Sequence, residues 1–521
     1  MKLNFTQSLS INKLSDYKLL GLCLSIGFFI RLIPELLAFS MPIGFDTIYY
    51  GYVMKSGVIL PHWSSFFTSS WLLYALIVPA YSVFQGDPFM LLKIVAPLLF
   101  GLNVAGVYWF SRKMLGWSPR MGLLAGVFFA LQLASLRISW DLLRNTLGLG
   151  ILMFALSYVK EVGSKRGFGL FAGLSLLAVF AHEYSAVILL VTVVGLLAWK
   201  LVKKQATFNY KMLALAIVPA LSVFLTGMFL RLNPIRYATQ SSIIPAGDVI
   251  TGKSGVFFLT NYLQVQTSVD YYANYWTLAL NVALLFTVLF LPYILLVKKG
   301  FFKNEILSIW TGLLLVGAFG CLIMPFFALQ YWHRWMFMLV YPFTFYAVYG
   351  IAKIVKSSNQ GKISLSELFS NKKAAGMILL TLSLGVAYLF TPTTMVYANK
   401  SVPNLTGTQV YFSTDPAVPY QDENSVVQAM DWFNQNLDSN ACVVLQHHFL
   451  EYGRLYLNNS EPIVHYEVDV DSAVDKAFES GFSQVFFVWW NQQVGWGDVS
   501  VPAGFTSVQD FGRISVYNYT V

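Results

Sequence analysis

Long runs of apolar residues, separated by short polar stretches, recur along the chain as far as residue 392. Most have about 20 residues, enough for a helix to cross the roughly 30 Å hydrocarbon core of a bilayer. The pattern predicts spanning helices near 19–40, 89–111, 119–138, 145–160, 167–181, 184–200, 212–231, 274–297, 304–328, 335–356 and 374–392. A shorter apolar run lies near 66–84. We therefore expect a membrane domain over 1–392 and a separate domain over 393–521.

The loops between these runs differ in positive charge. If 66–84 does not cross, the loops on one side hold 21 Lys and Arg residues and those on the other side hold seven. Cytoplasmic loops are enriched in Lys and Arg. This favours eleven spans with a cytoplasmic N-terminus and an extracytoplasmic C-terminal domain. It also predicts a long first outer loop, 41–88, with an interfacial or re-entrant helix, and a second long outer loop, 231–273.

The composition also indicates a membrane protein. Of 521 residues, 56% are hydrophobic and 11% are charged, whereas a soluble chain usually has about 25% charged residues. The net charge is +9, but residues 393–521 hold fourteen acidic residues against four basic ones. The basic excess thus belongs to the membrane loops and does not indicate nucleic acid binding. The three cysteines have no disulfide or metal-binding spacing.

Acidic residues and histidines gather in the loops expected on the outer side. They are Asp46, His62, Asp141, His182, Glu183, Asp270 and His333. Ionisable groups at membrane depth are costly and are functional candidates by default. Arg can bind a phosphate through two hydrogen bonds, and a carboxylate can accept a proton from an acceptor group. Asp46 and Arg334 are the minimum set for transfer from a membrane-borne phosphate. In the first span, Arg31 and Glu35 are spaced to pair on one helix face.

Three segments carry a family resemblance. Residues 44–50 (GFDTIYY) resemble the first outer loop of GT-C membrane glycosyltransferases, where a GxDxxYY-like segment presents the essential acid. Residues 139–145 (SWDLLRN) look like the second outer loop of that superfamily. Residues 334–342 (RWMFMLVYP) are similar to the Arg-led span that contacts the lipid phosphate in oligosaccharyltransferase catalytic subunits. The resemblance implies Asp46 and Asp141 as catalytic acids, with Arg334, His333, Arg144, His182, Glu183 and Tyr50 binding substrate.

The chain also departs from that family. Residues 429–436 (AMDWFNQN) look like the start of the soluble domain in archaeal members. Where oligosaccharyltransferases then place a WWDYG acceptor motif, residues 447–453 read HHFLEYG. The second outer loop has no DxD pair. A divalent metal, Mg²⁺ or Mn²⁺, held by Asp46 and Asp141 is therefore an open alternative, and no cofactor is certain.

Each candidate also has a structural alternative. Asp46 and Asp141 could cap the helices that follow them. Arg334 could be an interfacial anchor among aromatic residues. His182 and Glu183 could form a satisfied pair in the short turn between two spans.

Beyond residue 400 the pattern alternates between helix and strand. Helices are expected near 425–437, 451–457 and 472–480, and strands near 442–445, 463–468, 484–490, 505–511 and 513–519. This predicts a small α/β domain. His447 and His448 are adjacent, so in a strand they would point to opposite faces and would not easily share one ion.

The predicted fold is thus a polytopic α-helical membrane protein, GT-C-like, with a small extracytoplasmic α/β domain. The resemblance implies transfer of a sugar from a polyprenyl phosphate carrier, dolichyl phosphate in an archaeon, to a glycan, lipid or protein acceptor by inverting displacement. One alternative is an oligosaccharyltransferase-like enzyme that uses a pyrophosphate-linked glycan. Others are a lipid or anion transporter and a non-catalytic surface protein. Transporters are expected to show midplane charges and repeated halves.

Overall fold

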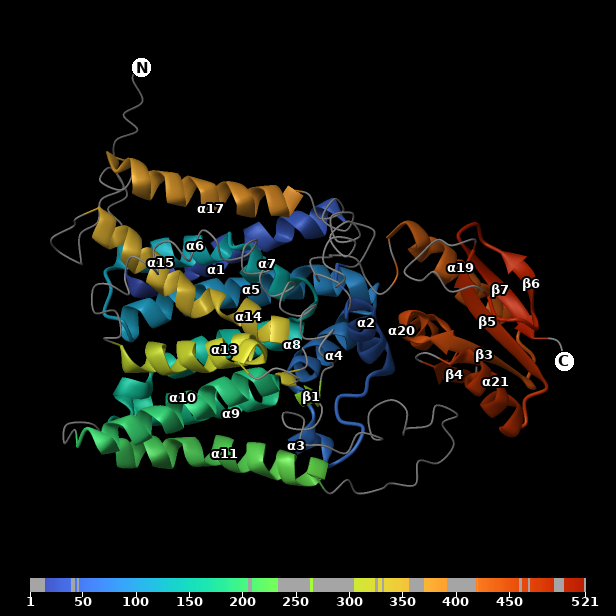
Figure 1. The fold of residues 1–521 in the computed structure, drawn as a ribbon, viewed down its shortest axis with the longest axis horizontal. Coiled ribbons are helices and arrows are strands. Elements are labelled where there is room, and N and C mark those ends of the chain that lie inside the picture. The colour runs from blue at the N-terminus through green and yellow to red at the C-terminus, as the bar shows by residue number, and fades with distance from the viewer. Residues whose placement is uncertain are drawn as a thin grey trace, which may run out of the picture.

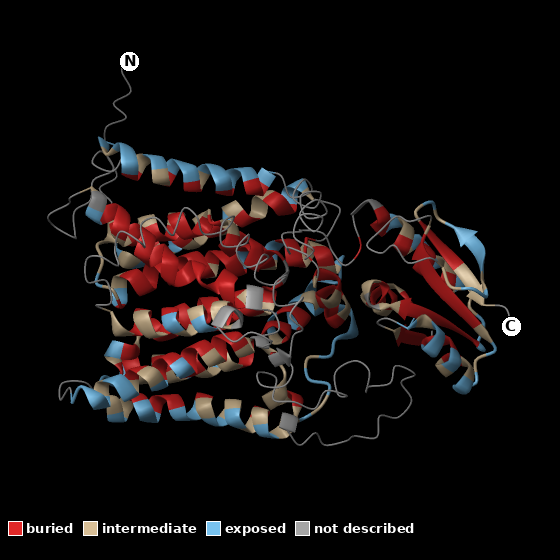
Figure 2. Ribbon diagram, in the orientation of Figure 1, coloured by how far each residue is buried: buried red, intermediate tan, exposed pale blue. Residues whose placement is uncertain are grey.

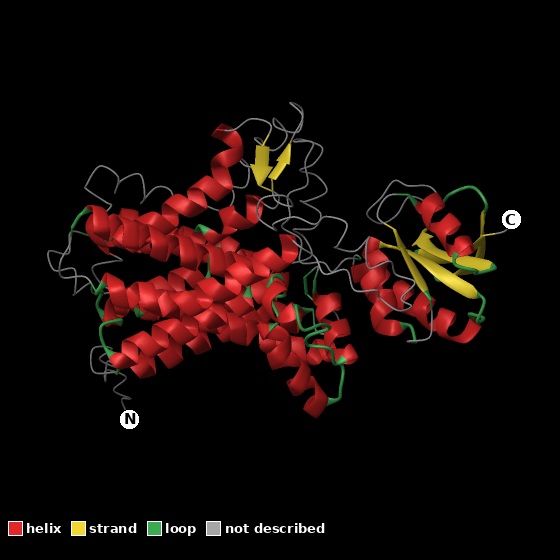
Figure 3. Cartoon of the chain, turned by 90° about the horizontal axis from the view of Figure 1, so that it is seen from below, coloured by secondary structure: helices red, strands yellow, loops and turns green. Residues whose placement is uncertain are grey.

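The chain folds into a bundle of long helices and a smaller domain of helices around a sheet (Figure 1). The computed structural model describes residues 15–38, 43–44, 46–204, 209–232, 263–265, 304–323, 327–329, 332–355, 370–390, 418, 420–458, 462–466, 469–491 and 501–519. Within these ranges, the side chains of Asp141, His333 and His447 are among those not described. Figure 3 shows the same two parts, with the five-stranded sheet confined to the C-terminal one.

Two antiparallel helices, α1 (Asp16–Leu37) and α5 (Pro88–Lys113), pack closely in the bundle. Their backbones meet at two glycines. A Cβ added to Gly101 would lie 2.5 Å from the carbonyl oxygen of Leu24, and one added to Gly27 would lie 2.8 Å from the Cα of Gly101. Small residues at such contacts let membrane helices approach closely. This contact sets the register of the two helices.

Ion pairs gather at one end of the bundle. They join Asp16 to Arg112, Lys113 to Glu161 and Lys200 to Glu305. These residues stand at helix ends that the loop charges predict to lie on one side of the membrane. At the opposite end of α1 and α5, Glu35 lies 3.3 Å from Lys93. Glu35 also lies 2.7 Å from Arg31, so the i, i+4 pairing expected from the sequence is confirmed.

The chain continues in α6 (Pro119–Ala130), α7 (Leu133–Asp141), α8 (Leu143–Ser157), the short 3-10 helix η2 (Val159–Glu161), α9 (Lys165–Ala181) and α10 (Glu183–Val202). The single span expected at 119–138 is broken, because α6 and α7 are bent by 61°. Ser118 caps α6 by accepting a hydrogen bond from the backbone of Met121, and Pro119 occupies the first helical position.

Later in the chain, the described residues form α11 (Tyr210–Leu232), α13 (Glu305–Ile323), α14 (Trp332–Met338), α15 (Val340–Ile354) and α17 (Lys372–Phe390). Among the described residues, six helices are long and apolar enough to cross a membrane, or seven if the bent pair counts as one span. The expected count of eleven is not confirmed. The expected span at 274–297 lies outside the described residues.

Apolar side chains cover the outward faces of the peripheral helices α11 and α17, which are largely exposed in Figure 2. Phe229 in α11 is 63% exposed and Phe390 in α17 is 57% exposed. Large exposed apolar surfaces mark contact with a partner or a membrane. Together with the long apolar helices, they describe an integral membrane protein whose outer faces contact lipid.

Three short helices follow α1 at the end of the bundle that carries Glu35. They are α2 (Thr47–Ser56), α3 (Ser65–Thr68) and α4 (Leu72–Phe84). The 13 residues of α4 span about 20 Å as a helix, less than the roughly 30 Å hydrocarbon core. A short antiparallel pair, β1 (Leu263–Val265) and β2 (Phe327–Leu329), lies elsewhere in the described chain.

The C-terminal part is an α/β domain whose sheet has the order β4-β3-β5-β7-β6. Its strands are β3 (Ala441–Gln446), β4 (Ile463–Tyr466), β5 (Gln484–Trp490), β6 (Phe505–Asp510) and β7 (Ile514–Tyr519). Strands β3, β4 and β5 are parallel to one another, β7 runs antiparallel to β5, and β6 runs antiparallel to β7. Its helices are α19 (Tyr420–Asn436), α20 (His447–Tyr456) and α21 (Val470–Glu479). The predicted order of helices and strands is confirmed.

One local expectation for this domain is wrong. His447 and His448 do not continue β3 but begin α20, since Gln446 caps that helix by accepting a hydrogen bond from the backbone of His448. Adjacent residues on a helix point about 100° apart. The alternation of faces expected in a strand therefore does not hold for residues 447 and 448.

The C-terminal domain contacts the bundle through α20 and α2, which lie side by side in Figure 1. Lys55 donates a hydrogen bond of 2.9 Å from Nζ to the carbonyl oxygen of Leu455. In the reverse direction, the Arg454 guanidinium lies 5.9 Å from the centre of the Tyr52 ring. The helix that begins beside Asp46 thus also supports the second domain.

Candidate functional site

Asp46 stands directly before α2, at its N-cap position. Its side chain makes no capping hydrogen bond to that helix and is half-buried. Gly44 has φ = 94°, a left-handed conformation that favours glycine. The glycine of the GFDTIYY segment therefore has a backbone role, turning the chain into α2. The missing cap argues against the capping alternative for Asp46.

Arg144, near the start of α8, lies within electrostatic range of Asp46. Its guanidinium carbon is 5.6 Å from the centre of the Tyr74 ring, and Asp46, Tyr49 and Tyr50 are among the groups that interact with it electrostatically. The Tyr74 ring lies 6.3 Å from that of Tyr49 and 6.4 Å from that of Tyr50. The guanidinium thus lies beside a cluster of tyrosine rings, two of which belong to the helix that Asp46 precedes. There an aromatic face stabilises the cation.

The segment before Asp141 is bound to the first span through Arg31. Arg31, fully buried in α1, donates from Nε to the Ser139 hydroxyl at 3.1 Å and from Nη2 to the Ser139 carbonyl at 3.2 Å. Its guanidinium carbon lies 4.5 Å from the centre of the Trp140 ring. Trp140 in turn donates a hydrogen bond of 2.6 Å to the hydroxyl of Tyr388. The backbone of Asp141, which ends α7, follows directly.

Glu35 and Lys93 complete this region. Lys93 lies within the α5 span and is 8% exposed. Its ammonium donates to the Glu35 carboxylate at 3.3 Å and to the Ala38 carbonyl at 2.9 Å, just past the end of α1. Both side chains border a cavity of about 10 Å³, whose lining also includes Thr47 and Trp140. This volume admits about one water molecule.

His182 is the single residue between α9 and α10. Its Nδ1 accepts a hydrogen bond of 3.1 Å from the backbone of Tyr184, so the imidazole caps α10. A Cβ added to Gly148 would lie 3.1 Å from the Cβ of His182. Gly148 follows Arg144 by four residues, so the two share a face of α8. His182 thus lies about one helical turn along α8 from Arg144, and Glu183 is the next residue along the chain. Capping of α10, a structural role, uses Nδ1 of His182.

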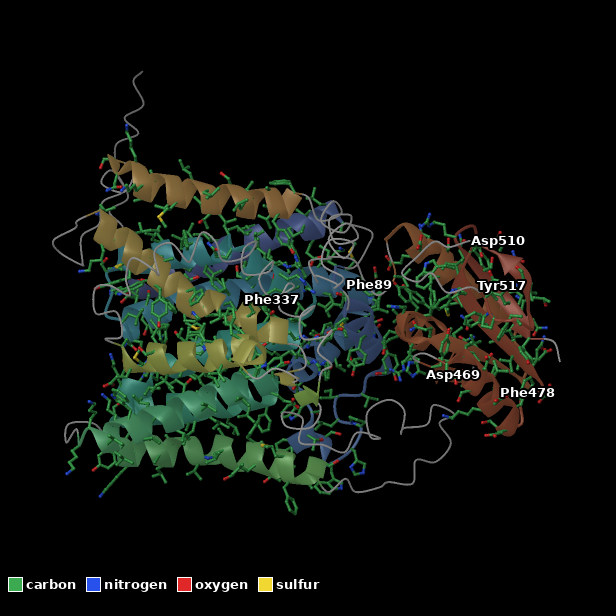
Figure 4. The ribbon with its side chains drawn as sticks, in the orientation of Figure 1. Phe89, Phe337, Asp469, Phe478, Asp510 and Tyr517 are labelled. Carbon is green, nitrogen blue, oxygen red and sulfur yellow. The ribbon has the colours of Figure 1, made fainter. Side chains whose placement is uncertain are left out.

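Arg334 is half-buried in α14, which packs against α7 and α13. The neighbouring Trp335 ring lies 5.3 Å from the ring of Tyr184, two residues after His182. Helix α14 is therefore joined through α10 to α8, the helix that carries Arg144. His333 shares this helix, and its side chain is not among those described. Figure 4 places Phe337 of the same helix inside the bundle.

The structure places Asp46 and Tyr50 within electrostatic range of Arg144, and it packs His182 against Gly148, on the face of α8 that carries Arg144. The Asp141 side chain lies outside the description, so its distance to Asp46 stays a prediction, and Asp270 lies outside the described residues. Within the described part of the chain, no three His, Cys, Asp or Glu side chains converge as metal ligands. The metal alternative, which needs the Asp141 carboxylate, is not tested by this observation.

Sequence reasoning missed Lys93 and the two tyrosines beside Tyr50. A signal for Lys93 was present, since it is a single lysine within the apolar run 89–111 and intramembrane cations default to functional candidates. Tyr74 lies in the run 66–84, and the apolar pattern of this run does not show which residues of the first outer loop it contacts.

Together these features describe a helical integral membrane protein whose candidate residues gather at the end of the bundle that meets an α/β domain. Two solved structures from Archaeoglobus fulgidus are similar to it. The archaeal oligosaccharyltransferase AglB in complex with an inhibitory peptide and a dolichol-phosphate matches with a TM-score of 0.48 and 12% identity, over 89% of this chain and 69% of that one. The oligosaccharyltransferase in the apo form matches with a TM-score of 0.51 and 12% identity, over 92% and 70%.

At 12% identity the likeness to the apo structure concerns the fold alone. It supports the expected membrane fold with a C-terminal α/β domain. No protein-family model matches the sequence, and no curated protein matches it.

Proposed function

We propose that this chain is a membrane glycosyltransferase that transfers a sugar from a polyprenyl phosphate carrier, such as dolichyl phosphate, to an acceptor at the outer membrane face. The observation that carries the proposal is the electrostatic interaction of the Asp46 carboxylate with the Arg144 guanidinium, which lies 5.6 Å from the centre of the Tyr74 ring. Both lie at the end of the bundle next to the α/β domain. The fold likeness supports it. The N-terminus is cytoplasmic and the α/β domain extracytoplasmic, in agreement with the positive charge of the loops.

The proposed reaction is a direct displacement. The acceptor oxygen or nitrogen forms a bond to the anomeric carbon while the bond from that carbon to the phosphate oxygen breaks, and the phosphate takes the electron pair. Asp46 accepts the acceptor's proton, because a carboxylate within hydrogen-bond reach serves as a general base. Arg144 and Arg334 stabilise the charge that develops on the phosphate, as guanidinium groups do through paired hydrogen bonds. Inversion at the anomeric carbon follows from the single displacement.

The other site residues have supporting roles in the proposal. Asp141 is the second acid, and Tyr50, His182, Glu183 and His333 line the donor. A divalent metal, if the enzyme uses one, would be held by Asp46 and Asp141. Transfer measured with Mg²⁺, with Mn²⁺ and with a chelator decides this point.

A second candidate, an oligosaccharyltransferase-like enzyme that uses a pyrophosphate-linked glycan, is favoured by the fold likeness. Against it stands the segment HHFLEYG at residues 447–453, which differs from the family's acceptor motif and forms α20. Parallel assays with dolichyl phosphate mannose and with a dolichyl pyrophosphate glycan separate the two. Transfer from the pyrophosphate donor alone would favour the second candidate.

The test uses the purified full chain in lipid nanodiscs with dolichyl phosphate [³H]mannose and dolichyl phosphate [³H]glucose. Native mass spectrometry counts bound dolichyl phosphate, and partition of the label measures transfer. Asp46→Asn is expected to abolish transfer with little effect on lipid binding, whereas Arg144→Ala and Arg334→Ala weaken both. Asp475→Asn, an exposed acid in α21, and Arg166→Ala, an exposed cation at the start of α9, are the matched controls. Wild-type transfer rates in Asp46→Asn and Arg334→Ala would remove the site assignment.

A further inference from the structure

We infer that Arg31, Glu35 and Lys93 form a positioning cluster that holds the segments carrying both candidate acids, Asp46 and Asp141. The inference rests on the proposed function. None of the three residues is assigned to substrate, and their role is to fix the backbone on which the acids stand. We keep the name positioning cluster for these three side chains.

The first arm of the cluster is Arg31. Its guanidinium holds Ser139 through the hydroxyl and the carbonyl, at 3.1 and 3.2 Å, and lies 4.5 Å from the centre of the Trp140 ring. These contacts fix two consecutive residues from two directions. Asp141 is the next residue along the chain, so these contacts restrain the position of its backbone.

The second arm is Lys93. It donates to the Glu35 carboxylate at 3.3 Å, to the Glu35 carbonyl at 3.3 Å and to the Ala38 carbonyl at 2.9 Å. The last carbonyls of a helix have no partner within the helix, and a lysine ammonium is well suited to bind them. Lys93 therefore fixes the end of α1, after which the chain proceeds to Asp46 and α2.

The cavity beside the cluster connects the two arms. Glu35 and Lys93 line it from α1 and α5, Thr47 lines it from α2 and Trp140 lines it from α7. Thr47 directly follows Asp46, and Trp140 directly precedes Asp141. One wall residue is thus the immediate neighbour of each acid. Figure 4 shows Phe89, which also lines this cavity, at the end of the bundle that faces the C-terminal domain.

A purely structural role explains the cluster less well. Burying charges is expensive, and well-packed apolar side chains often hold helices together equally well or better. The other end of the same helix pair shows the cheaper arrangement, since the Asp16 and Arg112 side chains there are 38% and 23% exposed. The buried cluster instead lies where two acids need fixed positions. Preorganised sites depend on such supporting hydrogen bonds.

The decisive variant is Arg31→Lys in the full chain, assayed in nanodiscs with dolichyl phosphate [³H]mannose or [³H]glucose, whichever donor the wild type uses. Lysine can keep the ion pair with Glu35 but cannot hold Ser139 at two points, because only arginine presents a planar fork. We expect kcat to fall about 10²-fold, the size of effect that a misplacement of about 1 Å produces. The KM for the donor and the melting temperature should stay close to wild type. A purely structural residue would lower the melting temperature and leave kcat per folded molecule unchanged.

Arg112→Lys is the matched control, since Arg112 also pairs with an acid, Asp16, and donates to a carbonyl, but at the other end of α5. It should leave kcat unchanged. Ser139→Ala, which removes only a hydroxyl, covers the case in which Arg31→Lys fails to fold, and it should also lower kcat. Equal kcat in Ser139→Ala, Arg31→Lys and the control would overturn the inference.

Hydrogen exchange supplies a readout that needs no activity. In Arg31→Lys, amides at 139–142 should exchange faster, whereas those at 133–136, at the start of the same helix, should not. One outcome would contradict the positioning cluster alone: the wild type transfers the sugar, Asp46→Asn abolishes transfer, and Arg31→Lys is fully active. Absence of transfer in the wild type with both donors would instead contradict the proposed function, and the exchange measurement would then decide whether the cluster holds this segment.

Discussion

Replacing Gly101 by alanine is expected to destabilise the bundle, because the added methyl group meets backbone atoms of α1. A Cβ at this position would lie 2.5 Å from the Leu24 carbonyl oxygen and 3.2 Å from the Phe28 nitrogen. Normal non-bonded contacts are about 3.5 Å, so α1 and α5 must separate by about 1 Å. No rotamer change relieves a contact with the backbone. Overpacking of this kind costs about 1–3 kcal/mol.

The matched control is Gly21→Ala on α1, where an added Cβ meets no atom within 4 Å. Alanine favours a helix over glycine by about 1 kcal/mol, and this gain is common to both variants. The free energy of unfolding should therefore differ between them by the overpacking alone, about 1–3 kcal/mol, with Gly101→Ala the less stable. Unfolding in mixed detergent micelles, followed by tryptophan fluorescence, measures the difference. Equal stability of the two variants would refute the close α1–α5 contact.

Three further predictions concern the C-terminal domain. Lys55 Nζ lies 6.0 Å from the centre of the Tyr456 ring, and the Arg454 guanidinium lies 5.9 Å from that of Tyr52. Replacing both cations by methionine should loosen the docking of α20 on α2 by about 1–2 kcal/mol, because each exposed cation–π contact is worth about 0.5–1 kcal/mol. Faster hydrogen exchange in both helices, with α21 unchanged, would show this. Burial raises the pKa of the Cys442 thiol to about 12, so iodoacetamide at pH 8 should modify it only after unfolding, as peptide mass spectrometry can report. A hydrogen bond from the Gly512 backbone N–H holds the pKa of the Asp510 carboxyl below its usual range. The ionised carboxylate therefore stabilises the fold above the unfolded pKa near 3.9, and this stabilisation is lost as the pH falls through the lower folded pKa. Thermal unfolding between pH 5 and pH 2 should accordingly show a smaller loss for Asp510→Asn than for wild type, and an equal loss would contradict the assignment.

The C-terminal domain was predictable because its patterns are local. The apolar strands β3 and β5 are short and are bounded by polar residues, and the terminal strands β6 and β7 flank a turn at Gly512. The start of α20 was not predictable in the same way. Gln446 is its cap, and glutamine is not among the residues that usually mark a helix start.

In the bundle, apolar length located the helices but not their breaks. The bend between α6 and α7 falls at Leu131 and Gln132, where no glycine or proline marks it. In the candidate site, the resemblance pointed to Asp46 and Arg144, whose relative position depends on how α2 packs against α8 through α4 and α5. Tertiary packing of this kind brings together residues far apart in sequence, so no local pattern could identify Tyr74 as their neighbour.

The glycine contact and the positioning cluster belong to one interface. Gly27 and Gly101 meet where α1 crosses α5, and Glu35 and Lys93 each lie eight residues from that contact, toward the same end of the antiparallel pair. Asp16 and Arg112 each lie eleven residues from it toward the other end. If the register shifted by one residue, the neighbouring residue, which points about 100° away, would stand in place of each charged residue. Both ion pairs would then be separated. The close approach that stabilises α1 against α5 therefore also decides whether Lys93 reaches the end of α1 beside the proposed catalytic acids.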